Sequence, residues 1–295
     1  MIAITGATGH LGNNLVRALA GQGRDVRCLV LQRDSLRPLE GLDVEVVHGD
    51  VRDRDALARA FRGADVVFHL ASVIAITSGQ ARLLDAVNAR GTRNVVETCL
   101  ECGVRRLVYT SSVHALVEPP RGRAIDEDMP FDPDRIRFAY GKSKARGTLA
   151  VLDGVRRGLD AVILSPTGII GPYDFAPSEM GRLFIAYARG QVRAYVDGGY
   201  DFVDVRDVAL GHIAASEKGR SGHAYVLSGE RVTVKALLET LAGLTGIPAP
   251  RRRIPGWAAD AIAPLSALFG RLARTKPLFT PDSLYYLRSN SESNH

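Results

Sequence analysis

Seven short apolar runs recur along the chain, and stretches with helical spacing separate them. The runs are continuous rather than alternating in polarity, which is typical of strands that are covered on both faces. They occupy residues 2–5, 26–30, 44–47, 65–70, 105–110, 161–165 and 223–228. Strands that alternate with helices predict an α/β fold with a parallel, doubly wound sheet. The 295 residues suffice for one large domain, or for two parts that share a core.

The first apolar run leads directly into a glycine-rich turn. In TGATGHLG, Gly6, Gly9 and Gly12 stand between the run 2–5 and a stretch of helical spacing at 10–20. Glycine lets the backbone approach a pyrophosphate, and the N-terminus of the following helix offers unpaired N–H groups and the positive end of its dipole. The order of strand, glycine turn and helix therefore predicts a dinucleotide-binding site.

The next two strands end where the adenosine half of a dinucleotide is expected. The second strand continues as LQRDS, without an acid in its last positions to hold a ribose 2′-hydroxyl, but with Arg33 nearby. This favours NADP over NAD, although Asp34 beside the arginine weakens the preference. Asp50 follows the third strand. It can reach an adenine amino group or serve as a turn or N-cap residue, and the sequence leaves both roles open.

A tyrosine and a lysine four residues apart point to proton transfer. Tyr140 and Lys144, in FAYGKSKA, share one face of a helix expected over 139–157. An ammonium group beside a phenol favours the phenolate, so we expect a lowered pKa for Tyr140 and a role as general acid/base. Upstream, YTSS ends the fifth strand in hydroxyls. Either Ser111 or Ser112 can then hydrogen-bond a substrate carbonyl in the crevice at the strand ends.

Together these motifs resemble the extended short-chain dehydrogenase/reductases, which are also described as the NAD-dependent epimerase/dehydratase family. The chain looks most like the bacterial relatives of dihydroflavonol 4-reductase and 3β-hydroxysteroid dehydrogenase within it. The resemblance covers nearly the whole chain. Its matching segments are TGATGHLG (5–12), GDV (49–51), HLAS (69–72), NARGTRNV (88–95), YTSS (109–112), YGKSK (140–144) and SPTGIIGP (165–172).

The resemblance implies a role for each residue of the expected site. Tyr140 is the acid/base, Lys144 holds the nicotinamide ribose and lowers the pKa of the tyrosine, and Ser112 donates to the carbonyl. No metal is expected. The residues expected to contact the cofactor are Gly6, Thr8, Gly9, His10, Leu11, Gly12, Arg33, Asp50, Val51, Leu70, Ala71, Asn88, Tyr140, Lys144 and Pro166.

Two positions depart from the pattern of the family. Leu31 stands directly after the second strand, where reductases of this group commonly carry arginine, so Arg33 is displaced. Val113 and His114 follow Ser112, where sugar-nucleotide dehydratases carry an acidic pair, so dehydration is not expected. We interpret His114 as a structural histidine beside a strand end.

The composition of the chain changes after Ser165. We expect a Rossmann domain over 1–165, to which the strand 223–228 returns, and a smaller substrate-binding lobe formed mostly by 166–295. Residues 166–202 are rich in proline and glycine, which predicts a looped region, and 233–246 predicts a helix. The substrate pocket is expected between the strand ends and a lobe built from 166–202 and 229–285.

We therefore predict an NAD(P)-dependent oxidoreductase that moves a hydride between nicotinamide and a carbonyl or alcohol carbon. The segment GPYDFAPSEMGRLF (171–184) suggests a small hydrophobic or aromatic substrate. A sugar-nucleotide epimerase with tightly bound NAD is one alternative, and a non-catalytic redox sensor that binds dinucleotide is another. The resemblance also implies a homodimer, formed through the helices that contain 82–102 and 139–157.

Charge and apolar content argue against several other classes of protein. The net charge of +6 is spread along the chain, which indicates a solvated surface rather than a nucleic-acid site. No apolar run reaches the roughly 18 residues of a membrane span. Three cysteines do not suggest disulfides, which predicts a cytoplasmic location, and Cys99 and Cys102 end a helix, which disfavours a redox site. The amphipathic segment 256–273 fits a packed helix, a lid or a membrane-contacting surface.

Overall fold

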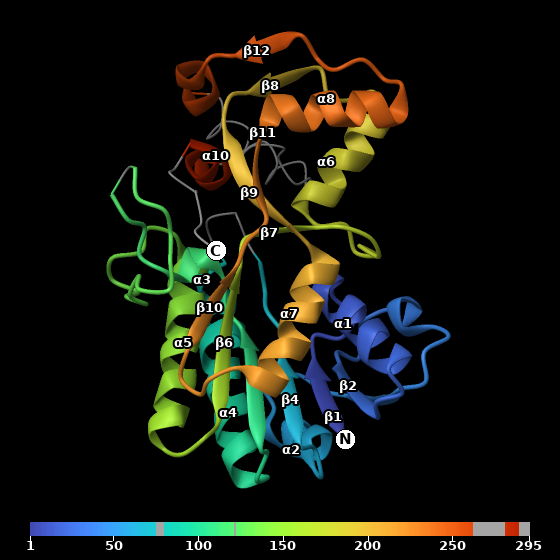
Figure 1. The fold of residues 1–295 in the computed structure, drawn as a ribbon, viewed down its shortest axis with the longest axis vertical. Coiled ribbons are helices and arrows are strands. Elements are labelled where there is room, and N and C mark those ends of the chain that lie inside the picture. Colours follow the sequence, from blue (N-terminus) through green and yellow to red (C-terminus); the bar gives the residue numbers. More distant parts are fainter. Residues whose placement is uncertain (75–79, 121, 262–280, 289–295) are drawn as a thin grey trace.

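A seven-stranded parallel sheet lies at the centre of the computed structural model, which describes residues 1–74, 80–120, 122–261 and 281–288 (Figure 1). Its strand order is β10-β6-β5-β4-β1-β2-β3. Each strand coincides with one of the seven predicted runs to within one or two residues, so the predicted fold class is confirmed. The strands are β1 (Ile2–Thr5), β2 (Val26–Val30), β3 (Glu45–His48), β4 (Val66–His69), β5 (Arg106–Thr110), β6 (Ala161–Pro166) and β10 (Ala224–Leu227).

Helices cover both faces of this sheet (Figure 1). Successive strand residues point to opposite faces, and both faces are buried: Ile4 packs with α1 and α7, whereas Ala3 packs in the core on the other side. This two-sided burial explains why the strands read as continuous apolar runs. One face carries α1 (His10–Gly21) and α7 (Val205–Lys218), and the other carries α2 (Arg54–Phe61), α4 (Thr92–Glu101) and α5 (Ala139–Arg156).

The helix predicted over 82–102 is divided into three parts. A short α3 (Ala81–Leu84) leads into a π-helical segment, η2 (Asp85–Gly91), and then into α4. Single π-helical turns inside α-helices occur frequently at functional sites. This one carries Asn88, which was expected near the cofactor. Cys99 and Cys102 lie at the C-terminal end of α4, as predicted, and burial raises the pKa of both thiols.

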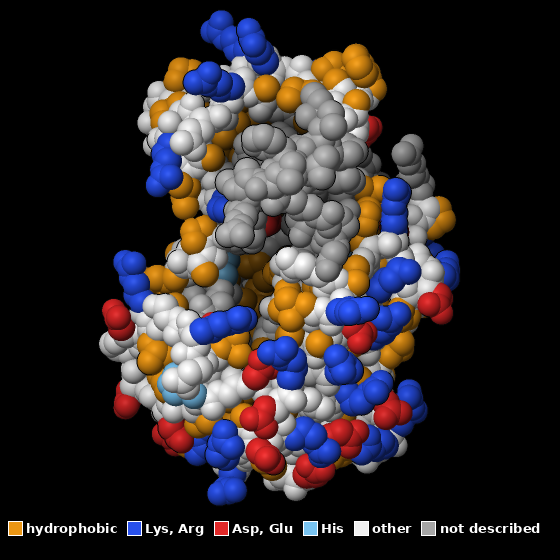
Figure 2. All heavy atoms as spheres, turned by 180° about the vertical axis from the view of Figure 1, so that it is seen from behind, with side chains coloured by type: hydrophobic (Ala, Val, Ile, Leu, Met, Phe, Trp, Pro, Cys, Tyr) orange, Lys and Arg blue, Asp and Glu red, His pale blue; other side chains and the backbone are white. Residues whose placement is uncertain are grey.

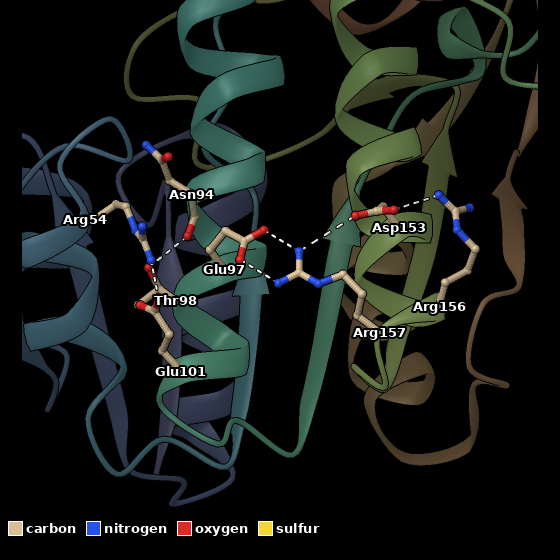
Figure 3. Close-up of polar contacts among 8 residues, drawn as sticks. All are labelled: Arg54, Asn94, Glu97, Thr98, Glu101, Asp153, Arg156 and Arg157. Carbon is tan, nitrogen blue, oxygen red and sulfur yellow. Dashed lines mark hydrogen bonds and ion pairs between the residues drawn. The ribbon is translucent and has the colours of Figure 1, made fainter.

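Ion pairs join the outer surfaces of α2, α4 and α5 (Figure 3). Arg157 at the end of α5 holds Glu97 of α4 with two hydrogen bonds of 2.5 and 2.7 Å. Arg54 of α2 pairs with Glu101 of α4. These groups are largely exposed, so solvent screens the pairs and they contribute little to stability. Elsewhere on the sheet half, basic and acidic side chains are interspersed, as the dispersed charge in the sequence predicts (Figure 2).

A smaller set of elements lies beyond one end of the sheet (Figure 1). One sheet has the order β11-β9-β7, and a two-stranded sheet pairs β12 with β8. The prediction that 166–202 is looped is wrong in part, because its glycines and prolines separate short strands and one helix rather than preventing them. The elements are β7 (Gly168–Ile170), α6 (Glu179–Ala188), β8 (Ala194–Val196), β9 (Gly199–Asp204), β11 (Glu230–Thr233), α8 (Val234–Thr245), β12 (Arg252–Ile254) and α10 (Pro281–Arg288).

The helix predicted over 233–246 is confirmed as α8, which ends at Gly246 in the left-handed conformation. The amphipathic segment 256–273 lies outside the described residues from 262 onward, and its first residues, 256–261, are helical. In the part of the chain that the structure describes, no helix is both long and apolar enough to cross a bilayer. Two 3₁₀ segments, η1 (Arg37–Leu39) and η3 (Val113–Ala115), complete the fold.

Candidate active site

The glycine turn after β1 packs closely against neighbouring backbone, and Gly6 and Gly12 leave no room there for a side chain. Gly6 has φ +75°, and a Cβ there would lie 2.7 Å from the backbone nitrogen of Ala71. A Cβ on Gly12 would overlap the Gly6 carbonyl. Gly9 is the N-cap of α1 and supplies no side-chain cap, and the first turn of α1 has no acidic residue. The turn therefore presents bare backbone N–H groups at a helix N-terminus, which fits a dinucleotide pyrophosphate.

The other residues of this turn are fixed by the protein itself. Thr8 donates its hydroxyl to Asp34 Oδ2 at 2.9 Å, and His10 Nε2 is 3.0 Å from the carbonyl oxygen of Pro172. Leu11 is buried in the core between the sheet and α1. The side chains of these three residues thus have partners within the chain, and their expected contact with a cofactor through backbone groups stays a prediction.

The loop after β4 packs directly against the glycine turn. Leu70 and Ala71 donate their backbone N–H groups to the carbonyl and the hydroxyl of Thr5, both at 3.2 Å. Asn88 holds the next residues, because its Oδ1 accepts from the Val73 N–H at 2.8 Å and its Nδ2 donates to the Val73 carbonyl at 2.9 Å. The side chain of Asn88 is therefore engaged in positioning this loop, and a direct contact with a cofactor is untested.

Asp50 forms an ion pair with Arg52 near the place where the adenosine end of the cofactor is expected. Asp50 accepts hydrogen bonds from the Arg52 guanidinium at 2.6 and 3.0 Å, which lowers the pKa of its carboxyl, and the charge of Arg33 adds to this effect. Arg33 itself is exposed and, within the described ranges, makes no ion pair. Val51 is buried and packs against Gly91. The Arg33 guanidinium thus lies near the place where the sequence predicts a 2′-phosphate.

The structure separates the roles of the two serines that follow β5. Ser111 is buried and its hydroxyl is 2.7 Å from Thr148 Oγ1 on α5, so it packs into the protein. Ser112 caps η3, accepting the His114 N–H at 3.2 Å, and its hydroxyl is near enough to that of Tyr140 to lower the pKa of the phenol. Of the two alternatives that the sequence left open, Ser112 is therefore the one that meets Tyr140.

Lys144 lies one helical turn from Tyr140 but contacts the end of β5 instead. Its Nζ donates to the Thr110 carbonyl at 2.6 Å and lies 4.7 Å from the centre of the Tyr109 ring. The side chain is buried, with only 2% of the residue exposed. Gly147 makes room here, because a Cβ at that position would lie 2.6 Å from the Tyr109 hydroxyl.

Burial reverses the expected effect of this lysine on the tyrosine. It lowers the pKa of Lys144 to about 7 and raises the pKa of Tyr140 to about 12, while hydrogen bonds from Ser112 and Ser72 lower the latter only in part. The predicted lowering of the Tyr140 pKa is therefore wrong for this structure. Removing water from a phenolate costs more than these hydrogen bonds recover. At neutral pH the phenol is protonated.

A cavity of about 390 Å³ lies beside this group. Its wall comes from the segments 113–119 and 135–138, from the small lobe and from α10. Most of the lining is apolar or aromatic, as with Val113, Ile136 and Phe138. The surface is hollowed between the lobe and the sheet half, with hydrophobic side chains around the hollow (Figure 2). The position agrees with the predicted pocket, but no pattern in the sequence indicated that 113–119 and 135–138 would contribute.

The aromatic residues that suggested a hydrophobic substrate lie elsewhere. Tyr173 and Phe175 stack on each other over α1, where the Arg17 guanidinium lies 4.3 Å from the centre of the Tyr173 ring. Neither lines the cavity. The hydrophobic character of the cavity comes instead from residues that sequence reasoning missed. The same wall also contains Tyr200 and His114, which the sequence indicated only as a structural histidine, and no spacing signal in the sequence connects the two.

Pro166 ends β6 and is buried beside β10, where it pairs with Leu227. The next residue, Thr167, donates its hydroxyl to Asp201 Oδ1 at 2.8 Å and lies in the cavity wall. Pro166 thus lies where the sheet meets the cavity, and its contact with a cofactor remains a prediction.

Comparisons with known proteins agree with this geometry. The NAD dependent epimerase/dehydratase family matches residues 2–228. Sterol demethylase protein B of Methylococcus capsulatus is 39% identical over 97% of this chain and 88% of that protein. A putative dihydroflavonol 4-reductase of Synechocystis is 36% identical over 86% of this chain and 75% of its own length. The crystal structure of gox2253 has a TM-score of 0.85 at 31% identity and covers 99% of this chain and 89% of that one.

Proposed function

The chain belongs to the NAD dependent epimerase/dehydratase family and is an NAD(P)-dependent oxidoreductase, and on that premise we propose that it reduces the ketone group of a hydrophobic, ring-bearing substrate. The observation that carries the proposal is the proximity of Tyr140 and Ser112 at the carboxyl ends of the strands, beside a largely apolar cavity. In open α/β sheets, ligands bind in the crevice at those strand ends.

The first 165 residues form the cofactor-binding part in this proposal, with β10 added, and 166–295 form most of the substrate-binding lobe. The glycine turn holds the pyrophosphate through backbone N–H groups at the start of α1. Bound there, the nicotinamide supplies the hydride. Lys144 would hold the nicotinamide ribose in this proposal, through amine hydrogens that its bond to the Thr110 carbonyl does not use.

Tyr140 delivers the proton in the proposed reaction. Because burial keeps its phenol protonated at neutral pH, Tyr140 is prepared to act as a general acid, which favours reduction over oxidation. Ser112 donates a hydrogen bond to the carbonyl oxygen as negative charge develops on it. Both groups lie at the same point of the crevice, so one substrate oxygen can meet the two of them.

The class of substrate is inferred from the cavity and from the relatives. The lining is mainly apolar or aromatic, and the two relatives are named for a sterol and for a dihydroflavonol, which are both ring-bearing compounds. We propose NADP rather than NAD as the cofactor, because Arg33 is exposed near the adenosine end. The exposed Leu83 and Leu149, on α3 and α5, support a homodimer through these helices. The free cysteines support a cytoplasmic location.

The test measures ketone turnover and the amount of cofactor bound to the purified protein. We expect oxidation of added NADPH, followed at 340 nm, with at least one ketone in a panel of alkyl, aryl and polycyclic ketones. No turnover across the panel would contradict the proposal. Denaturing the purified protein separates it from the sugar-nucleotide epimerase alternative: the reductase releases little cofactor, whereas an epimerase releases one equivalent of NAD.

A further inference from the structure

His114 and Tyr200 meet in the wall of the cavity, next to the proposed catalytic residues. The Tyr200 hydroxyl and His114 Nε2 are hydrogen-bonded at 2.6 Å. His114 follows Ser112 by two residues, and its backbone N–H donates to the Ser112 hydroxyl. Tyr200 comes from β9 of the small lobe. The pair therefore connects the loop that carries Ser112 to the lobe on the opposite side of the cavity.

The imidazole is held in one orientation by its neighbours. Its ring centre lies 3.8 Å from that of Tyr286 on α10, and the Tyr140 ring meets it edge-on at 6.4 Å. On the backbone side, the His114 carbonyl lies against Gly141, where any Cβ would overlap it. A fixed imidazole this close to Tyr140 lies beside the place where the substrate carbonyl meets Ser112.

The pair has hydrogen-bonding capacity that the protein does not use. Burial lowers the pKa of His114 to about 4, so its imidazole is neutral at pH 7 and has one donor and one acceptor. The bond to Tyr200 uses one donor and one acceptor of the pair. Whichever group donates, one donor and one acceptor remain. Among the residues that the structure describes, neither side chain has a second hydrogen-bond partner. Partly buried groups of this kind take a hydrogen-bond partner, which either water or a polar ligand atom in the cavity can supply.

The charge around the pair limits what that atom can be. Asp201, next to Tyr200, is in the cavity wall and only 3% exposed. Its Oδ1 accepts the Thr167 hydroxyl at 2.8 Å and the Gly229 N–H at 3.1 Å. Arg135 and Arg137 also line the cavity, but the Asp201 carboxyl is next in sequence to Tyr200 and disfavours an anionic substrate group at this point. A hydroxyl, which is neutral and both donates and accepts, matches the unused donor and acceptor.

We propose that His114 and Tyr200 bind a second oxygen of the substrate, a hydroxyl close to the reacting carbonyl, so that the enzyme prefers hydroxylated ketones. This inference rests on the proposed function for the position of the reacting carbonyl. It changes the interpretation of His114 from a structural histidine to a specificity-determining residue.

The test measures binding and turnover with two pairs of compounds that differ by one hydroxyl. Isothermal titration calorimetry compares 1-phenylethane-1,2-diol with 1-phenylethanol on the NADP-loaded enzyme. NADPH oxidation compares 2-hydroxyacetophenone with acetophenone. We expect the wild type to bind the diol at least tenfold more tightly. His114→Phe and Tyr200→Phe should each remove that difference while leaving the affinity for 1-phenylethanol within about twofold.

Two further variants separate recognition from damage to the fold. His114→Asn, which keeps a polar amide near the imidazole position, should retain part of the preference. Tyr285→Phe, whose hydroxyl pairs with Glu118 instead, should retain all of it. Equal affinity of the wild type for both alcohols, or no binding of either, overturns the inference. A preserved binding preference without NADPH oxidation of either ketone contradicts the proposed function, and it leaves standing only the part of the inference that assigns hydroxyl binding to His114 and Tyr200.

Discussion

Replacing Gly6 by alanine tests whether the turn after β1 depends on a close backbone approach. Gly6 has φ +75°, and a Cβ at this position would lie 2.7 Å from the Ala71 backbone nitrogen. Rotation of a side chain can relieve neither problem, because both arise from the backbone. Gly23 has a similar φ of +68° but open space around its Cβ position, so Gly23→Ala is a matched control. The left-handed conformation costs an alanine about 1–2 kcal/mol at either site. At Gly6 the overlap adds about 1–3 kcal/mol.

Urea denaturation should therefore show that Gly6→Ala lowers the free energy of unfolding by about 2–5 kcal/mol and Gly23→Ala by about 1–2 kcal/mol. NADPH affinity, measured by calorimetry on the folded fraction, should fall for Gly6→Ala alone, because relieving the overlap moves the turn away from the Ala71 backbone. Equal losses of stability and unchanged NADPH affinity in both variants would refute the reasoning about the close approach.

Three other predictions concern side chains. Ser112→Ala should lower kcat by about 10²–10³-fold, the usual cost of losing one oxyanion donor. Ser111→Ala should affect mainly stability, because the Ser111 hydroxyl bonds Thr148. Similar kcat values in the two variants would contradict this assignment. Arg33→Ser should weaken NADPH binding in titrations and leave NADH binding unchanged. Burial lowers the pKa of His212 to about 4 from 6.5, although its hydrogen bond to the Val208 carbonyl acts in the opposite direction. The unfolded state then binds more protons below pH 6.5, so the free energy of unfolding should fall between pH 6.5 and 4. His212→Gln should flatten that dependence in denaturation curves, and an unaltered slope would exclude His212 as its source.

Much of the fold could be predicted from the sequence because local patterns determine it. The strands of the central sheet are buried on both faces, so each is a continuous apolar run bounded by turn residues. The glycines at 6, 9 and 12 are equally visible in the sequence, and at Gly6 and Gly12 the backbone lies too close to other backbone to carry a Cβ. The lobe was less predictable, since strands of only a few residues such as β7 leave no periodicity that could separate them from loops.

The candidate site was predictable only where its residues follow strand ends or helical spacing. Ser112 and Tyr140 were found this way, and in the structure Ser112 is near enough to lower the pKa of the Tyr140 phenol. The pKa of Tyr140 was predicted with the wrong sign, because a spacing of four residues shows a neighbouring lysine but not the burial of both groups. The pair of His114 and Tyr200 could not be found, since 86 positions separate them and only the tertiary fold joins them.

The rate of hydride transfer in Tyr140→Phe tests the central claim most directly. Deuterium transfer from 4-deuterated NADPH to the best ketone of the panel is followed in single-turnover experiments. The NADPH dissociation constant is measured for the same variant. Loss of a general acid should slow transfer by about 10²–10⁴-fold, with NADPH binding within about threefold of the wild type. Transfer at the wild-type rate in this variant would show that Tyr140 does not deliver the proton, and would contradict the mechanism proposed for this site.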